Sequence, residues 1–179
     1  AEVCEKMLAW AWACAEGLGG DMLELYCGNG NFTLPLARKF RRVLATEVSK
    51  TSVNAALWNI EANQSHNVQI ARLSAEEFTE AYLGGREFRR LQEQGIALAD
   101  YEFSTIFVDP PRAGCTETVL KTFANMQPDR IVYVSCNPAS LARDLAVLEQ
   151  LGYKAKKVQP VDMFPHTPHQ EVIVELVRP

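Results

Sequence analysis

The sequence predicts an α/β protein built on a seven-stranded, mostly parallel sheet with one antiparallel strand and helices on both faces. Short apolar segments rich in β-branched residues alternate six times with segments of helical periodicity. That alternation is typical of a parallel sheet covered by helices. The last two apolar segments are separated only by a loop, so the final strand can run antiparallel.

Composition fits a single domain over residues 1–179. Of these residues 47% are hydrophobic, which is enough for one core. There is no apolar run of 18 or more residues, so we expect no membrane span. The five cysteines include no Cys-x-x-Cys pair, which favours reduced thiols in the cytoplasm and predicts no metal site. With a net charge of −4, contact with nucleic-acid phosphates would need a local basic patch.

The first half of the chain predicts three strands and four helices. They are a helix over 4–16, a strand over 21–27, a helix over 33–39, a strand over 42–48, a helix from a cap at Ser49 to about Asn63, a strand over 67–72 and a helix opened by the capping box Ser74–Glu77. In the first helix Met7, Leu8, Ala11 and Trp12 share one face. In the third we expect Val53, Leu57 and Ile60 to turn inward, with Trp58 as a further candidate for that face.

The second half predicts four strands and two helices after a loop. They are a loop over 92–102, a strand over 103–109, a helix over 117–125, a strand over 131–135, a helix over 139–151, a strand over 154–161 and a strand over 172–177. One reversed strand among seven differs from the usual dinucleotide-binding sheet. It favours a Rossmann-like fold of the methyltransferase type.

A glycine-rich turn follows the first predicted strand. Gly28-Asn-Gly30-Asn31-Phe32 would let backbone amides approach a ligand closely. Glu47 follows Gly28 by 19 positions, near the spacing at which a carboxylate binds a ribose diol. Thr33 replaces the third glycine of the dinucleotide motif, and a tight turn without a ligand is the alternative. Together these features favour an adenosine-containing cofactor, either NAD or S-adenosylmethionine.

Two later strands end in reactive side chains. Asp109 precedes Pro110-Pro111, whose fixed backbone forces an extended exit from the strand. Cys136 follows a run of β-branched and aromatic residues and precedes Asn-Pro138, where a helix can begin. A helix N-terminus favours a thiolate. The alternative is that Cys136 is a small buried hydrophobe.

Four segments together resemble the RNA 5-methyluridine methyltransferases that act on tRNA and 23S rRNA. They are Glu24-Leu-Tyr-Cys-Gly-Asn-Gly-Asn-Phe32, Asp109-Pro-Pro-Arg-Ala-Gly114, Val132-Tyr-Val-Ser-Cys-Asn-Pro138 and Asp162-Met-Phe-Pro-His-Thr-Pro-His-Gln-Glu171. The resemblance covers nearly the whole chain. It implies a class I S-adenosylmethionine-dependent methyltransferase fold for residues 1–179, as a catalytic domain without the family's N-terminal RNA-binding portion.

The resemblance also implies roles for individual residues. Cys136 would be the nucleophile that attacks carbon 6 of uracil, and Glu171 the base that resolves the adduct. The residues implied to bind S-adenosyl-L-methionine are Tyr26, Gly28, Gly30, Asn31, Glu47 and Asp109. Ser140 and Gln170 depart mildly from the family pattern.

For partners, the resemblance implies RNA, no membrane and a cytoplasmic monomer. The first 110 residues look most like the tRNA branch, which modifies the T-loop uridine, whereas Ser140 to Asp144 looks more like the 23S rRNA branch. Candidate phosphate contacts are Arg112 and the Arg86 to Arg90 cluster, although the pattern of the cluster favours a solvated helix face. The competing functions are a methyltransferase that acts on a small molecule or protein, and a non-catalytic cofactor-binding or RNA-chaperone module.

Overall fold

Seven strands lie in one sheet in the computed structural model, which describes residues 2–15, 19–162 and 170–179. The strand order is β3-β2-β1-β4-β5-β7-β6. The strands are β1 (Asp21–Leu25), β2 (Arg42–Thr46), β3 (Val68–Ala71), β4 (Phe103–Val108), β5 (Arg130–Ser135), β6 (Lys154–Val161) and β7 (Glu171–Val177). The β1–β2, β1–β4, β2–β3 and β4–β5 pairs are parallel, and β7 is antiparallel to both β5 and β6. The predicted fold class is confirmed, with β7 as the reversed strand.

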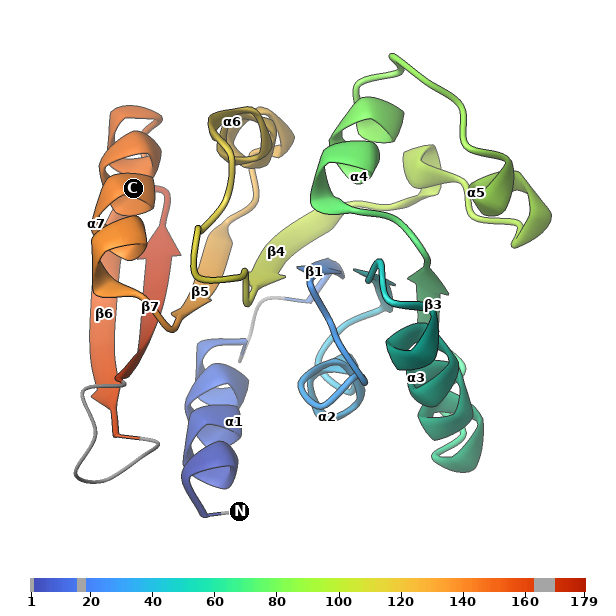
Figure 1. The fold of residues 1–179 in the computed structure, drawn as a ribbon, viewed down its shortest axis with the longest axis horizontal. Coiled ribbons are helices and arrows are strands. Elements are labelled where there is room, and N and C mark those ends of the chain that lie inside the picture. The colour runs from blue at the N-terminus through green and yellow to red at the C-terminus, as the bar shows by residue number, and fades with distance from the viewer. Residues whose placement is uncertain (1, 16–18, 163–169) are drawn as a thin grey trace.

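Helices cover the sheet on both faces (Figure 1). They are α1 (Glu2–Cys14), α2 (Thr33–Ala37), α3 (Lys50–Ala62), α4 (Ala75–Tyr82), α5 (Arg89–Glu93), α6 (Glu117–Met126) and α7 (Pro138–Gln150), with a short 3₁₀ turn over Leu98–Asp100. The buried residues of α1, α2 and α3 pack on one face, and those of α4 to α7 pack on the other.

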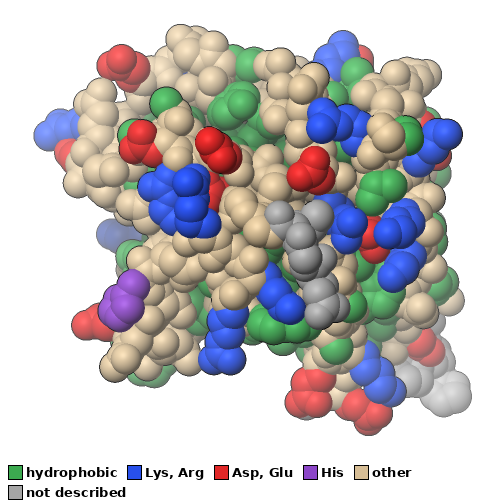
Figure 2. Space-filling model, turned by 180° about the vertical axis from the view of Figure 1, so that it is seen from behind, with side chains coloured by type: hydrophobic (Ala, Val, Ile, Leu, Met, Phe, Trp, Pro, Cys, Tyr) green, Lys and Arg blue, Asp and Glu red, His purple; other side chains and the backbone are tan. Residues whose placement is uncertain are grey.

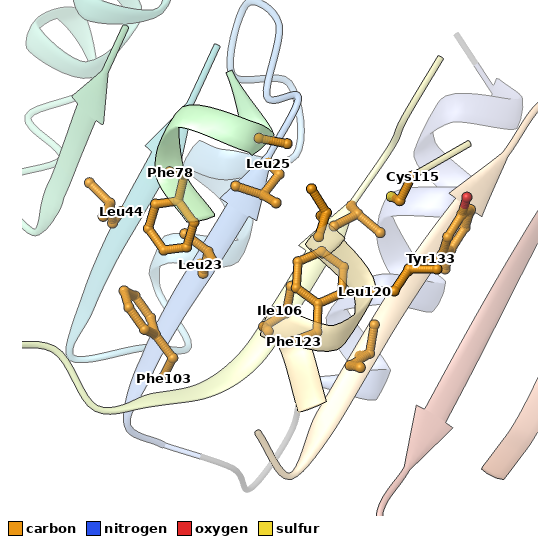
Figure 3. Close-up of a cluster of buried hydrophobic side chains, with 14 of the residues drawn as sticks. Leu23, Leu25, Leu44, Phe78, Phe103, Ile106, Cys115, Leu120, Phe123 and Tyr133 are labelled. Carbon is orange, nitrogen blue, oxygen red and sulfur yellow. The ribbon is translucent and has the colours of Figure 1, made fainter. Parts of the chain in front are cut away.

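Alternation along the strands divides the core into two layers. Met22 and Val132 face the α1–α3 layer, whereas their neighbours Leu23 and Ile131 face the α4–α7 layer, part of which is drawn in Figure 3. Central strands buried on both faces have near-continuous apolar sequences, which explains why the strands were visible in the sequence.

Side-chain caps start the helices where the sequence indicates. The Ser49 hydroxyl accepts from Ser52 N–H at 3.3 Å at the start of α3. Ser74 and Glu77 form the predicted reciprocal capping box of α4. Asn137 caps α7, and Pro138 occupies its first turn. Each such cap contributes about 1 kcal/mol.

Helix α3 buries less of its surface than its sequence pattern predicts. Val53 and Ala56 are buried, but Leu57 is 42% and Trp58 69% exposed, so the inward orientation expected of these two was wrong. The physical reason is that α3 packs beside β3, the outermost strand, where little sheet lies beneath it. The segment 92–102, expected to be a loop, also contains the end of α5 and the 3₁₀ turn.

Candidate active site

Strand β1 is where the sheet topology changes direction. The chain moves outward from β1 to β2 and β3 on one side and to β4 and β5 on the other. In open α/β sheets, ligands bind at the carboxyl ends of the strands at this position. Leu25 is level with Thr46 on β2 and with Val108 on β4. The residues that follow on the three strands are Tyr26, Glu47 and Asp109, so three predicted site residues come together.

The turn after β1 has an unusual backbone. Tyr26, Gly28 and Gly30 have φ of 60°, 56° and 86°. This left-handed region is open to glycine but costs free energy for tyrosine, and such strain gathers at functional sites. A Cβ on Gly28 would meet nothing within 4 Å, so its backbone borders open space. Asn31, at the end of the turn, is exposed. The N–H groups of Gly28 and Gly30 donate to Glu47 Oε2 and to the Cys27 carbonyl, so close approach of a ligand to this turn stays a prediction.

Glu47 is fixed by backbone amides. Its Oε2 accepts from Gly28 N–H at 3.0 Å, and its Oε1 accepts from Val48 and Ser49 N–H at 3.1 Å. A carboxylate has about four acceptor positions, so one remains for a hydroxyl of a bound molecule. The bond to Gly28 also ties the acid to the glycine turn. The two features that predicted a cofactor site are thus in direct contact.

Two further acids lie at this end of β1 and β4. Glu24 is 2% exposed, and its carboxylate accepts from the Thr33 hydroxyl. Burial, with the nearby charge of Asp109, outweighs this bond and raises the pKa of Glu24 to about 8. Asp109 follows the end of β4, and its side chain is exposed. Desolvation by the surrounding protein and the negative charge of Glu171 raise the pKa of the Asp109 carboxyl to about 7.

Cys136 and Glu171 lie level with each other on neighbouring strands. The antiparallel β5–β7 ladder ends with Ser135 opposite Val172. One step further, the residue after Ser135 is Cys136 and the residue before Val172 is Glu171. Cys136 is half-buried beside the start of α7, and burial raises the pKa of Glu171. The structure therefore brings the predicted nucleophile and base together, two strands from β1.

The other cysteines have surroundings unlike those of Cys136. Cys14, Cys27 and Cys115 are buried, and burial is the main cause that raises the pKa of each thiol, to about 12 for Cys14 and Cys115. Such thiols are poor nucleophiles because the thiolate is the reactive form. Cys4 is exposed on α1. Cys136 thus combines partial exposure with a place at the carboxyl edge of the sheet.

The basic residues proposed as phosphate contacts differ in their pairing. Arg86, Arg89 and Arg90 lie within 4.0 Å, 2.7 Å and 2.7 Å of carboxylates of Glu80, Glu93 and Glu77. These pairs favour the solvated-surface interpretation of the cluster. Arg112 is exposed and, among the described residues, has no carboxylate within 4.0 Å. Its carbonyl accepts from Asn137 Nδ2 at 3.0 Å, which places it next to Cys136.

A hollow of about 390 Å³ opens near Glu171, between the start of α1 and the ends of β6 and β7. It is lined by Val3, Lys6, Met7, Trp10, Gln159, Pro160, Val161, Asp162 and Ile173. His166 and His169 lie outside the described residues. Within the described parts of the chain, no three His, Cys, Asp or Glu side chains are grouped to hold a metal, and no helix has the length and apolar character of a membrane span.

On the face seen in Figure 2, Lys and Arg lie in small groups, several beside Asp or Glu.

Sequence reasoning did not assign a role to Glu24. An acid inside the apolar run of β1 is the signal that could have found it, because a buried carboxyl needs a local reason. The bond from the Thr33 hydroxyl and the proximity of Asp109 supply that reason: Glu24 is a buried acid beside the carboxyl edge of the sheet.

Comparison with known sequences decides the family. The profile described as tRNA (uracil-5-)-methyltransferase matches residues 1–179. The chain belongs to this family. A curated relative from Neisseria meningitidis, a tRNA/tmRNA (uracil-C(5))-methyltransferase, is 63% identical over 96% of the chain and 46% of its own length. Another with that name, from Acinetobacter baylyi, is 58% identical over 99% of the chain and 49% of its own length. The chain thus spans about half the length of the curated relatives that it matches.

Solved structures agree with the family assignment. The tRNA (uracil-54, C5)-methyltransferase of Pyrococcus abyssi, in complex with S-adenosyl-L-homocysteine, has a TM-score of 0.77 and 29% identity, over 97% of this chain and 38% of that one. A precorrin-6y C5,15-methyltransferase from Geobacter metallireducens has a TM-score of 0.71 at 13% identity, over 97% of this chain and 87% of that one. The second likeness shows the fold alone. The Rossmann-like fold of S-adenosylmethionine-dependent methyltransferases is therefore confirmed.

Proposed function

We propose that residues 1–179 form the catalytic domain of an enzyme that transfers a methyl group from S-adenosyl-L-methionine to carbon 5 of a uridine in tRNA. The observation that carries this proposal is the register of β5 and β7. It sets Cys136 level with Glu171, at the sheet edge that also holds Asp109 and the glycine turn. This reaction requires a nucleophile and a base beside the cofactor site.

The residues at the end of β1 fit S-adenosylmethionine. We assign Glu47, with its remaining acceptor position, to a ribose hydroxyl, and the open space beside Gly28 to close approach of the cofactor, with Gly30 shaping the turn. Tyr26 and Asn31 complete this side of the proposed site. Asp109 follows β4 at the same edge of the sheet, and its carboxylate, once ionised, attracts a cationic group of the ligand. When bound, the cofactor supplies an electrophilic methyl group.

Cys136 supplies the electrons that make carbon 5 of uracil reactive. Its thiolate adds to carbon 6, and the electrons of the carbon 5–carbon 6 double bond move toward the oxygen on carbon 4. Carbon 5 then has the electron density to form the bond to the methyl carbon. The start of α7, capped by Asn137, lies beside the thiol.

Glu171 completes the reaction by taking a proton. Its carboxylate removes the hydrogen from carbon 5, the double bond re-forms, and the bond between Cys136 sulfur and carbon 6 breaks. Burial raises the pKa of Glu171, which makes the ionised form a stronger base. The reaction needs that ionised form, so the rate of this step should fall as the pH drops through the pKa of Glu171.

Transfer RNA is the substrate that the relatives support. The proteins that are 58% and 63% identical are both named for tRNA and tmRNA, and the P. abyssi enzyme is named for uracil 54. We extend this to the T-loop uridine, with Arg112 as a phosphate contact beside Cys136. The uridine must leave its stack to reach the thiol. We further propose that the protein acts as a cytoplasmic monomer.

The proposal is tested by trapping. In the full-length protein, tRNA containing 5-fluorouridine should form a covalent, methylated adduct in the presence of S-adenosylmethionine, because fluorine cannot be removed as a proton. Cys136→Ala should abolish the adduct, seen as a loss of the shifted band on a denaturing gel. The matched control is Cys27→Ala, which removes a buried thiol from the adjacent cofactor turn and should keep trapping. Normal cofactor binding without any wild-type adduct would sink the mechanism, and an adduct with 23S rRNA in place of tRNA would correct the substrate.

Glu171→Gln separates the second half of the reaction from the first. This variant should still form the methylated adduct with ordinary tRNA, but release should slow by about a hundredfold or more, since general base catalysis contributes on that scale. The measurement is the lifetime of the adduct after mixing. Release at the wild-type rate would remove Glu171 from the role of base.

A further inference from the structure

Asp144, on α7, is a buried carboxylate with all its acceptor positions filled. It is 0% exposed. Its Oδ2 accepts from Cys115 N–H at 2.8 Å and from the Tyr133 hydroxyl at 2.5 Å. Its Oδ1 accepts twice from the Arg143 guanidinium, at 3.0 Å and 3.1 Å. Four donors around four acceptor positions require a carboxylate, because an amide in its place would offer two acceptor positions and two donors.

The donors around Asp144 come from three separate elements. Cys115 belongs to the turn after Asp109-Pro-Pro-Arg112, Tyr133 to β5 and Arg143 to α7. Figure 3 shows Cys115 and Tyr133 next to each other at one end of the core. Tyr26, the proposed cofactor residue, packs against the same cluster of buried side chains that contains Cys115. Asp144 therefore joins the cofactor side of the sheet edge to the helix that begins beside Cys136.

The same face of α7 holds the whole turn from Arg112 to Cys115. The Arg112 carbonyl accepts from Ser140 Oγ at 2.8 Å and from Asn137 Nδ2 at 3.0 Å, and the Ala113 carbonyl accepts from Arg143 at 2.5 Å. Residues three or four positions apart on a helix share a face, so this row of contacts is continuous. Every described polar contact of the turn with α7 thus reaches the first two turns of the helix that starts at Pro138.

Gly114 shows how closely the turn is seated. Its φ is +76°, and its N–H donates to the Pro111 carbonyl at 2.8 Å. A Cβ there would lie 2.5 Å from Asp144 Oδ2 and 2.8 Å from Arg143 Nη2. The turn therefore lies in close contact with the carboxylate, and Asp144 holds its backbone through the bond from Cys115 N–H.

From this geometry we infer that Asp144, with Tyr133, is a positioning residue that sets where Arg112 meets an RNA phosphate relative to Cys136. The inference rests on the proposed function, in which Arg112 contacts RNA and Cys136 attacks uracil. Asp144 itself does not touch the substrate. It acts by holding the Arg112 turn against α7, so its loss should affect RNA binding and adduct formation but not cofactor binding.

The test compares two tyrosine-to-phenylalanine variants in the full-length protein. Tyr133→Phe removes one of the four bonds to Asp144. Tyr153→Phe is the matched control, because Tyr153 is equally buried and its hydroxyl donates to the Pro128 carbonyl at 2.8 Å, before the amino end of β5. Asp144→Asn is the stronger variant, and Arg112→Gln removes the phosphate contact itself.

The first readout is the salt dependence of tRNA binding. Removing one phosphate contact lowers the slope of log Kd against log salt by about 0.7 to 0.9. Arg112→Gln should show this loss, Asp144→Asn should approach it, Tyr133→Phe should show part of it, and Tyr153→Phe should show none. The double variant Tyr133→Phe with Arg112→Gln should have the slope of Arg112→Gln alone. Equal slopes for Tyr133→Phe and Tyr153→Phe, with Asp144→Asn like wild type, would overturn the inference.

The second readout separates the inference from the proposed function. Adduct formation with 5-fluorouridine tRNA should slow at least tenfold in Asp144→Asn, while the Kd for S-adenosylmethionine stays within about twofold of wild type. If the wild type forms no adduct but the salt slopes change as expected, the proposed chemistry fails and the positioning stands. If the wild type forms the adduct and the rate of adduct formation is unchanged in Tyr133→Phe and Asp144→Asn, Asp144 has a structural role alone.

Discussion

The pKa of Glu24 gives a quantitative test of the buried acid near the end of β1. The carboxyl group is 2% exposed, and its pKa rises from 4.5 to about 8 on folding. Between these two values the native protein holds a proton that the unfolded chain has released. The unfolded state therefore binds fewer protons, and stability must fall as the pH rises through this window. From about pH 5.5 to about pH 8.5, the contribution of Glu24 to the free energy of unfolding should decrease by about 3 kcal/mol.

Glu24→Gln isolates this contribution from those of other groups. Glutamine keeps a carbonyl that can accept from the Thr33 hydroxyl, but it does not ionise, so the slope due to this site disappears. The measurement is urea unfolding of both proteins at about pH 5.5, 7 and 8.5. The variant should gain about 3 kcal/mol on the wild type from the lowest to the highest pH.

Glu61→Gln, which removes an exposed carboxylate from α3, is the control and should show no such gain. The free energies of unfolding of Glu24→Gln and wild type are compared across this range. If their difference changes by less than about 0.5 kcal/mol, Glu24 does not hold a proton in the folded protein, and our account of this buried acid is refuted.

Three further predictions concern other parts of the molecule. A cation that binds beside Asp109, whose pKa is raised to about 7, must expel its proton; the affinity for S-adenosylmethionine, measured by calorimetry, should therefore fall up to about tenfold per pH unit below pH 7. Asp109→Asn should bind weakly with a flat pH profile, and an unchanged slope would contradict the assignment. Gly114→Ala places a methyl group 2.5 Å from Asp144 Oδ2 and should lower the free energy of unfolding by about 2–4 kcal/mol. Gly95→Ala, with φ +66° and open space around it, should cost only the backbone strain of about 1–2 kcal/mol; equal losses in urea unfolding would rule out the close contact at Gly114. Trp58→Ser should change stability by less than about 0.5 kcal/mol, and a larger loss in the same assay would mean that this 69% exposed side chain is buried in solution.

The strands and the turns between strand and helix could be predicted because their signals are local. The run from Ile131 to Val134 is apolar on both faces since helices cover both faces of β5. Gly28 and Gly30 adopt left-handed backbone conformations that favour glycine. The seven-stranded sheet with a reversed final strand followed from the order of these local signals.

What the sequence could not provide depends on neighbours that are distant along the chain. A helical pattern says which face of α3 is apolar, but not that β3 beneath it is the edge of the sheet, so Leu57 and Trp58 were misplaced. Asp144 looks like a surface residue of a helix, and its donors at Cys115 and Tyr133 are 29 and 11 positions away.

The reversed direction of β7 has a consequence for the order in which the molecule can be completed. Strand β6 is joined to the sheet through β7, which lies between it and β5. A chain still lacking its last segment can therefore pair the strands from β3 to β5 but leaves β6 without a place to attach. Because β7 enters from the carboxyl edge, its first residue, Glu171, reaches that edge as the strand inserts. During synthesis, the proposed cofactor site at the ends of β1, β2 and β4 can therefore fold before Glu171 is in place. Completion of the sheet and arrival of the proposed base are then one event.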